Sequence, residues 1–149
     1  GRKGRAWSSI FSSCTGFFMT RTHIATGSQY EQLMGYSRAV LTGDTLRVSG
    51  CSGLPGLDEA PGDGAAQFFR AVRKIEGILG QAGLSLADVV RSRLYLTDAA
   101  DWEPLIAAHG VAFGSVRPAC TMVQVCRLID PRMRIELEVT AVRAFLPKA

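Results

Sequence analysis

Two segments near the C-terminus alternate between apolar and polar residues, which is the pattern of β-strands. Residues 134–142 follow it almost strictly, and residues 117–128 follow it less regularly. Because successive side chains of a strand point to opposite faces of its sheet, Glu136 and Glu138 lie together on one face and their aliphatic neighbours on the other. A face with two carboxylates does not pack against apolar helices, so it meets water or lines an interface. We expect the functional site on this face.

The linker between these strands, residues 129–133, is short and polar and contains a proline. Such a linker predicts that the two strands lie close in space. We therefore expect Cys120, Met122 and Gln124 on the same sheet as the two glutamates, with Cys120 near Glu138.

Upstream, the pattern predicts a hairpin and a long helix. Residues 37–41 and 45–49 are two extended segments joined by a turn that contains glycine. Asp63 is a good N-cap for a helix that runs through Ala82 and ends at Gly83. The core-facing stripe of this helix repeats at helical spacing and consists of Phe68, Val72, Ile75, Leu79 and Ala82.

A further strand and a second helix follow. Residues 89–97 are rich in Val, Leu and Tyr, which favours a strand. Asp98 or Asp101 then caps a helix, in which His109 is expected to be half-buried and structural. The apolar face predicted for this helix comprises Trp102, Leu105, Ile106 and Phe113.

The order of these elements is strand, strand, helix, strand, helix, strand, strand. Two helices and about five strands pack most economically as an α+β fold, with a single mixed β-sheet and both helices on one face. The face that bears Glu136 and Glu138 then stays uncovered within one chain. A half-covered sheet of this kind tends to associate with other copies.

Length and composition fit one soluble domain. The chain has 149 residues, 47% of them hydrophobic, and no apolar run reaches the length of a membrane span. The net charge is +4, but Arg2, Lys3 and Arg5 lie in an acid-free stretch before residue 19. The rest of the chain is nearly neutral, which argues against a strongly basic nucleic-acid-binding surface. The four cysteines show neither CxxC nor zinc spacing, which fits a reducing cytosol.

Five ordered segments carry a resemblance to a known family. They are residues 35–40 (Gly-Tyr-Ser-Arg-Ala-Val), 46–50 (Leu-Arg-Val-Ser-Gly), 82–90 (Ala-Gly-Leu-Ser-Leu-Ala-Asp-Val-Val), 94–98 (Leu-Tyr-Leu-Thr-Asp), and Pro118-Ala119-x-Thr121-x-Val123-x-Val125-x-Arg127-Leu128 with Ile135-Glu136-Leu137-Glu138. This series resembles the Rid family, which is also called YjgF and, in older usage, the L-PSP endoribonuclease family. The likeness runs from about Gly35 to Val142. It implies a chorismate-mutase-like ββαβαββ fold that forms trimers, with sheets facing inward and pockets between subunits.

The resemblance also implies a chemistry. Rid deaminases hydrolyse imines and enamines released by pyridoxal-phosphate enzymes, with an arginine on the substrate carboxylate and a glutamate that helps to hold the attacking water. A guanidinium binds a carboxylate through two parallel hydrogen bonds, and a fixed carboxylate can orient or deprotonate water. The family's glutamate falls on Glu138, and neither a cofactor nor a metal is implied. The expected pocket residues are Tyr36, Gly50, Cys51, Cys120 and Met122.

One position departs from the family pattern, because Cys120 stands where the deaminases have their arginine. A thiol has no fork of donors, and each lost hydrogen bond to a charged group costs about 1.5–3 kcal/mol of substrate binding. A replacement cation could come from Arg117, or from Arg47 or Arg93 of a neighbouring subunit. Arg117 is disfavoured, since it lies on the opposite face of its strand. Cys120 itself is interpreted as a small neutral pocket wall, because a neighbouring carboxylate disfavours the thiolate that a nucleophile needs.

The N-terminal segment is interpreted separately. Residues 1–18 are small, basic and serine-rich, a composition found in transit peptides and also in disordered or non-native extensions. We favour an extension, because the resemblance begins well after Met19, and we expect the domain to span residues 19–149. Residues 20–32 are interpreted as a polar, turn-rich segment with His23 at the surface.

Three functions follow as hypotheses. The first is an imine or enamine deaminase-type hydrolase that lacks the usual substrate-gripping arginine. The second is a non-catalytic trimer that binds a small metabolite in the same clefts. The third, an endoribonuclease, is suggested by the older family name and disfavoured by the nearly neutral body without an aromatic and basic platform. The expected partners are a small imine, enamine or carbonyl metabolite and further copies of the chain, with neither membrane nor nucleic acid, in the cytoplasm.

Overall fold

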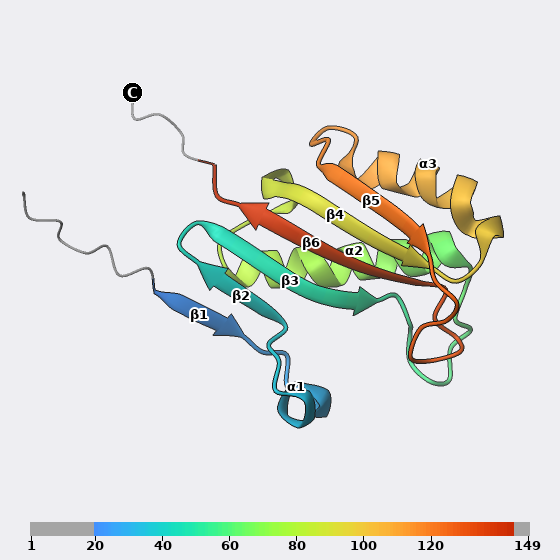
Figure 1. Cartoon of the computed structure of the whole chain (residues 1–149), viewed down its shortest axis with the longest axis horizontal. Helices are drawn as coiled ribbons and strands as arrows, with labels where there is room; N and C mark the ends of the chain where they lie inside the picture. Colours follow the sequence, from blue (N-terminus) through green and yellow to red (C-terminus); the bar gives the residue numbers. More distant parts are fainter. Residues whose placement is uncertain (1–19, 145–149) are drawn as a thin grey trace, which may run out of the picture.

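The computed structural model describes residues 20–144 of the chain (Figure 1). The extension expected at residues 1–18 lies outside the described residues. Within residues 20–144, no helix has both the length and the apolar character needed to cross a membrane.

Six strands and three α-helices form the described part of the chain. The strands are β1 (Arg21–Ile24), β2 (Ala39–Thr42), β3 (Thr45–Ser52), β4 (Val89–Leu96), β5 (Ala119–Gln124) and β6 (Ile135–Val142). The helices are α1 (Gln29–Met34), α2 (Gly64–Gln81) and α3 (Trp102–Phe113), with short 3-10 turns at Leu86–Asp88 and Ala99–Asp101. The predicted hairpin is β2–β3, the predicted long helix is α2, and the strand predicted at residues 89–97 is β4.

The strands form one mixed sheet in the order β1-β2-β3-β6-β4-β5. Every neighbouring pair is antiparallel except β4 and β5, which are parallel and joined through α3. Helices α2 and α3 pack against each other and cover one face of this sheet (Figure 1). The expected α+β fold, a single mixed sheet with its long helices on one face, is confirmed. We call the two sides of the sheet the covered face and the open face.

The hydrophobic core lies between the covered face and the two long helices. Leu137 of β6 is in register with Leu94 of β4 and with Cys51 of β3, and all three are buried. Most of the stripe predicted for α2 is buried against them, namely Phe68, Val72, Ile75 and Leu79. Asp63 caps α2 as predicted, because its carboxylate accepts a 2.9 Å hydrogen bond from the Ala66 N–H.

The first two elements, β1 and α1, correct the expectation of a turn-rich segment at residues 20–32. Strand β1 lies at the edge of the sheet, where only Ile24 is buried, so its sequence shows no apolar alternation. Helix α1 is a single short element whose one buried residue is Glu31, a charged side chain. Neither element has the periodic apolar pattern from which sequence predicts a strand or a helix. His23 is exposed, as expected.

The last two strands lie in the same sheet, as expected, but they are not neighbours, since β4 lies between β5 and β6. Residues 125–134 cross the end of β4 instead of making a hairpin. Leu96 O accepts a 2.8 Å hydrogen bond from the Val125 N–H, and Arg134 O accepts one of 3.0 Å from the Thr97 N–H. These two bonds attach both ends of the linker to the last residue of β4 and to the residue after it, where the linker crosses that strand.

The apolar face predicted for α3 is half right. Leu105 and Phe113 are buried, but Trp102 is 46% exposed and Ile106 is 50% exposed. Helix α3 is apolar on most of its surface, so its sequence period does not distinguish the buried side. His109 is half-buried as expected, and its Nε2 lies 2.8 Å from the hydroxyl of the buried Ser92, which links α3 to the sheet.

Candidate functional site

A β-bulge interrupts β3 where the predicted pocket residues begin. Val48 is paired with Val139 and Cys51 with Leu137, so two residues of β3 lie opposite one residue of β6. Gly50 is one of those two residues. Bulges bend a strand and leave a backbone group unpaired, and they occur frequently beside active sites. The bulge therefore frees the Gly50 carbonyl for a side-chain donor.

Arg38 is that donor, and it contacts all three predicted pocket residues from the N-terminal half of the chain. Its Nη1 donates to Gly50 O at 2.7 Å and lies 3.9 Å from Cys51 Sγ. Its Nη2 donates to the Tyr36 hydroxyl at 2.7 Å, and the guanidinium carbon lies 5.3 Å from the centre of the Tyr36 ring. The Arg38 side chain is only 15% exposed. One largely buried guanidinium thus fixes a phenol, a backbone carbonyl and a thiol.

Glu31 on α1 balances part of this charge. Its Oε1 lies 3.7 Å from Arg38 Nε and accepts a 2.7 Å hydrogen bond from the Thr26 hydroxyl. The hydrogen bond from Thr26 is the main reason why the pKa of Glu31 lies below its ordinary value. Helix α1, which the sequence did not predict, therefore serves to hold Arg38 in place.

Glu136 lies directly against Gly50. A Cβ added to Gly50 would come within 2.7 Å of Glu136 Oε1, so a residue without a side chain leaves room for this carboxyl group. Burial raises the pKa of Glu136, and the charge of Glu138 adds to the rise, whereas Arg38 opposes it. Burial likewise raises the pKa of the Cys51 thiol. We call Tyr36, Arg38, Gly50, Cys51 and Glu136 the Arg38 cluster.

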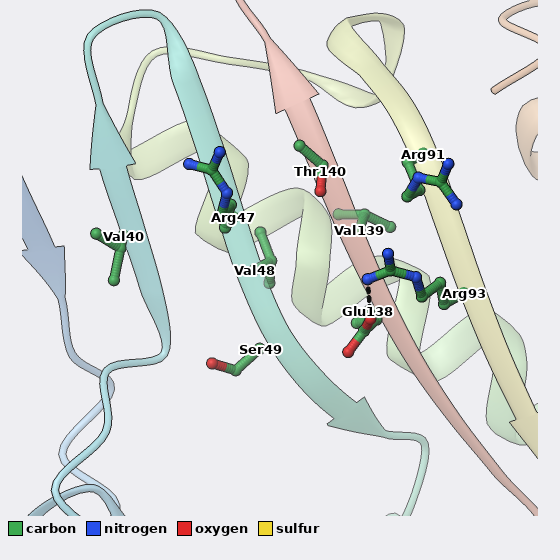
Figure 2. A pocket seen from close by; sticks show the side chains of 9 residues that line it. All are labelled: Val40, Arg47, Val48, Ser49, Arg91, Arg93, Glu138, Val139 and Thr140. Atoms are coloured by element: carbon green, nitrogen blue, oxygen red, sulfur yellow. Dashed lines mark hydrogen bonds and ion pairs between the residues drawn. The ribbon is translucent and has the colours of Figure 1, made fainter. Parts of the chain in front are cut away.

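Glu138, the predicted catalytic residue, also lies on the open face but has a different partner. Its Oε1 accepts a 2.9 Å hydrogen bond from Arg93 Nη1 of the neighbouring strand β4, as Figure 2 shows. The two side chains are 30% and 47% exposed. Glu138 thus belongs to a partly solvated ion pair beside the Arg38 cluster.

Cys120 and Met122 lie elsewhere in the chain. They are in register with Ser92 and Leu94, which are buried on the covered face, so both side chains point away from Glu138. Strand β5 is an edge of the sheet, where Cys120 is exposed, while Met122 packs against the core. Within one chain, the structure therefore brings together Tyr36, Gly50 and Cys51, whereas Cys120 and Met122 lie on β5, with β6 and β4 between that strand and β3.

Of the cluster, Arg38 was not expected, and Glu136 was expected on the functional face but not among the pocket residues. Arg38 lies two positions after Tyr36, so strand alternation alone would have placed both on one face. Glu136 lies on the same face as Glu138. The two differ because the bulge in β3 brings the Gly50 backbone against Glu136. Among residues 20–144, no group of three or more His, Cys, Asp or Glu side chains is placed to hold a metal ion.

The fold and the cluster together define a small α+β domain that carries polar groups on the open face of its sheet. The model of one family, described as Endoribonuclease L-PSP, matches residues 26–143. The chain belongs to this family, which is the L-PSP, YjgF or Rid family that its sequence resembles.

Relatives of known structure or activity agree with this assignment. A Mycobacterium tuberculosis member of the YjgF/YER057c/UK114 family is 44% identical in its crystal structure, with a TM-score of 0.76 over 83% of this chain and 100% of that one. The 2-iminobutanoate/2-iminopropanoate deaminase of Escherichia coli K12 is 31% identical over 129 residues, 84% of this chain and 99% of that protein. Escherichia coli TdcF with bound serine is 27% identical, with a TM-score of 0.65 over 73% of this chain and 88% of that one.

Proposed function

We propose that this protein is a small-molecule hydrolase of the imine or enamine deaminase type, and that the Arg38 cluster is one half of its active site. The observation that carries the proposal is the half-buried Glu136 carboxyl group, held against the Gly50 backbone beside a fixed guanidinium. The similarity to the 2-iminobutanoate/2-iminopropanoate deaminase supports the reaction class. The serine bound to TdcF supports a small ligand.

Hydrolysis of an imine adds water across the C=N bond and then expels ammonia, so it needs a group that first accepts and then donates a proton. Glu136 suits this role, because its raised pKa brings the carboxyl group nearer to the working pH. Arg38 orients the Tyr36 hydroxyl and adds positive charge for an anionic part of the substrate. The assignment of the same role to Glu138 stays a prediction. We favour Glu136, because Arg93 already holds the Glu138 carboxylate.

The other half of the proposed site comes from a second copy of the chain. Cys120 and Met122 lie at the β5 edge, with β6 and β4 between them and the β3 residues of the Arg38 cluster. An arrangement that sets the edge of one copy against the open face of another would bring the two groups together. Trimers are typical of this family, and we propose a homotrimer with Cys120 as a small neutral wall of the shared cleft.

Site-directed variants test the proposal. Wild type, Glu136→Gln and the matched control Glu138→Gln would be assayed for ammonia release from an imino acid generated in the same cuvette. We expect Glu136→Gln to lower kcat by about 10²–10⁴-fold, the usual contribution of a general acid–base, and Glu138→Gln to keep most of the activity. Wild-type turnover by Glu136→Gln would refute this role. Loss in Glu138→Gln alone would favour the assignment made from the family motif.

A second variant addresses the departure at Cys120. Because the thiol cannot grip a carboxylate, we expect weak wild-type turnover of imino acids and a gain in Cys120→Arg. Vigorous wild-type deamination would show that the arginine is dispensable here.

The alternative, a non-catalytic metabolite-binding trimer, is favoured by the same substitution and by the serine-bound relative. It predicts thermal stabilisation by a ligand that is recovered chemically unchanged. Chemical conversion of the bound ligand would exclude it.

We also propose a cytoplasmic location. Cys51, Cys120 and Cys126 are free thiols, and free thiols are typical of reducing compartments. Expression of a tagged full-length chain followed by cell fractionation would test it, and recovery in an oxidising compartment would contradict it.

A further inference from the structure

A hollow of about 490 Å³ lies on the open face, separate from the Arg38 cluster (Figure 2). Strands β2, β3, β6 and β4 contribute its lining, which consists of Val40, Arg47, Val48, Ser49, Arg91, Arg93, Glu138, Val139 and Thr140. Its volume falls within the range of about 300–1,000 Å³ that is usual for small-molecule sites. Neither Arg38 nor Glu136 lines it. We call it the arginine hollow.

Two of its arginines form one cross-strand row. Arg47 on β3 and Arg91 on β4 are both in register with Thr140 on β6, so they lie on either side of that hydroxyl (Figure 2). Neighbouring strands are about 4.8 Å apart, which places the two Cα atoms about 10 Å from each other. Arginine side chains are long enough for both guanidinium groups to reach one ligand above Thr140.

The charges of this row have no carboxylate partner in the described part of the chain. Within residues 20–144, neither Arg47 nor Arg91 forms an ion pair with a carboxylate. Arg93 differs, because Glu138 neutralises it at 2.9 Å. Among the described residues, the arginine hollow therefore contains two positive charges without a carboxylate partner, one on each side of Thr140. Two like charges about 10 Å apart with only a hydroxyl between them repel each other, so the row favours an anion that both can bind.

We propose that the arginine hollow binds a small multivalent oxyanion, such as a di- or tricarboxylate or a phosphate ester, between Arg47 and Arg91. Each guanidinium presents a planar fork of N–H donors that matches a carboxylate or a phosphate. The Thr140 hydroxyl adds a donor between the two forks. The size of the hollow and the neutral character of the Arg93–Glu138 pair favour a compact ligand over an extended polyanion. This inference does not depend on Glu136 being catalytic.

Binding of defined anions to the full chain tests the proposal. Citrate, inorganic phosphate and sulfate would be titrated calorimetrically and by thermal unfolding, with chloride at equal ionic strength as the reference. Wild type is expected to bind at least one of the multivalent anions with a saturable rise in Tm that chloride does not reproduce. Comparison of citrate with phosphate then shows whether carboxylate or phosphate chemistry is preferred.

Substitutions of single arginines test whether Arg47 and Arg91 bind the anion. Arg47→Gln and Arg91→Gln are each expected to weaken binding about tenfold or more, and the double variant is expected to abolish it. Arg73→Gln removes an exposed arginine from α2, on the other side of the molecule, and is expected to bind like wild type. Should a glutamine variant fail to fold, Arg47→Lys keeps the charge but not the fork and is expected to bind more weakly than wild type.

Three results would overturn the inference. The first is a Tm that follows ionic strength alone, and the second is anion binding that survives in the double variant. The third is short single-stranded RNA that binds through Arg47 and Arg91 and is not displaced by citrate or phosphate, since this would identify the row as a nucleic-acid contact.

Discussion

The two faces of the sheet differ although the same strands build both. On β6, Leu137 and Val139 are buried beneath the helices, whereas Glu136, Glu138 and Thr140 alternate with them on the open face. The covered face consists of close-packed apolar side chains, and the open face carries charges, a bulge and a hollow. The residues that stabilise the fold and the residues that carry the proposed chemistry therefore lie on opposite sides of β6. Substitutions at neighbouring positions should change either the stability or the ligand chemistry, but not both.

The sharpest contrast is between Leu137→Ala and Thr140→Ala. Leu137 is fully buried, and its truncation should lower the free energy of unfolding by about 2–5 kcal/mol, from lost transfer energy and a residual cavity. Thr140 is only half-buried, so its truncation should change that free energy by no more than about 0.5 kcal/mol. Urea unfolding followed by circular dichroism measures both, and equal losses would deny the contrast.

Within the open face, Arg38 and Arg47 should differ. Replacement of Arg38 by Met leaves the Gly50 carbonyl and the Tyr36 hydroxyl without their donor. Such unsatisfied groups should lower the free energy of unfolding by about 1–3 kcal/mol. Arg47→Met, which removes no ion pair within residues 20–144, should change it by less than about 0.5 kcal/mol. The same denaturation measurement compares them, and similar values would mean that the Arg38 contacts contribute nothing.

The pH dependence of stability should identify the buried carboxyl group. Because burial raises the pKa of Glu136, the folded chain keeps this proton to a higher pH than the unfolded chain does. Stability therefore falls as the pH rises from the unfolded value of about 4.3 through the folded pKa, and the penalty then stays constant. Glu136→Gln should have a higher Tm than wild type at neutral pH, with a gain that vanishes toward pH ~4. Thermal scans across this range test the prediction, and a gain independent of pH would contradict it.

The smallest effect is expected for the Arg93–Glu138 pair. Both side chains are partly exposed, so their coupling energy should be about 0.2–1 kcal/mol and should decrease in high salt. A double-mutant cycle of Arg93→Ala and Glu138→Ala at two salt concentrations measures it. A coupling well above this range would indicate that the open face is shielded from solvent in the assembled protein.

Much of the fold could be predicted, because its elements have strong local patterns. The β2–β3 hairpin, α2 with its Asp63 cap and the alternating β6 each follow from residues close in sequence. The position of β5 could not be predicted, since strand order depends on contacts between distant segments. Strand β1 and helix α1 were missed because each buries only one side chain. A single buried residue produces no periodic pattern of apolar positions in the sequence.

The site could be predicted only in part, for a related reason. Tyr36, Gly50 and Cys51 do lie together, but the Arg38 guanidinium that connects them depends on a bulge. A bulge changes which residues oppose each other, and no single residue in the sequence signals it. Cys120 was expected near Glu138, but register with β4 turns it to the covered face. Such a register is a tertiary property, and a shift of one residue reverses the face.

We propose that the open face is completed by other copies of the chain, which bring the Cys120 edge to the Arg38 cluster. Sedimentation equilibrium of the full chain at micromolar concentration tests it most directly. We expect a single species with three times the 16.0 kDa mass of one chain. A monomer at the concentrations where ligand or substrate binds would contradict it, because β6 and β4 separate the two groups within one chain.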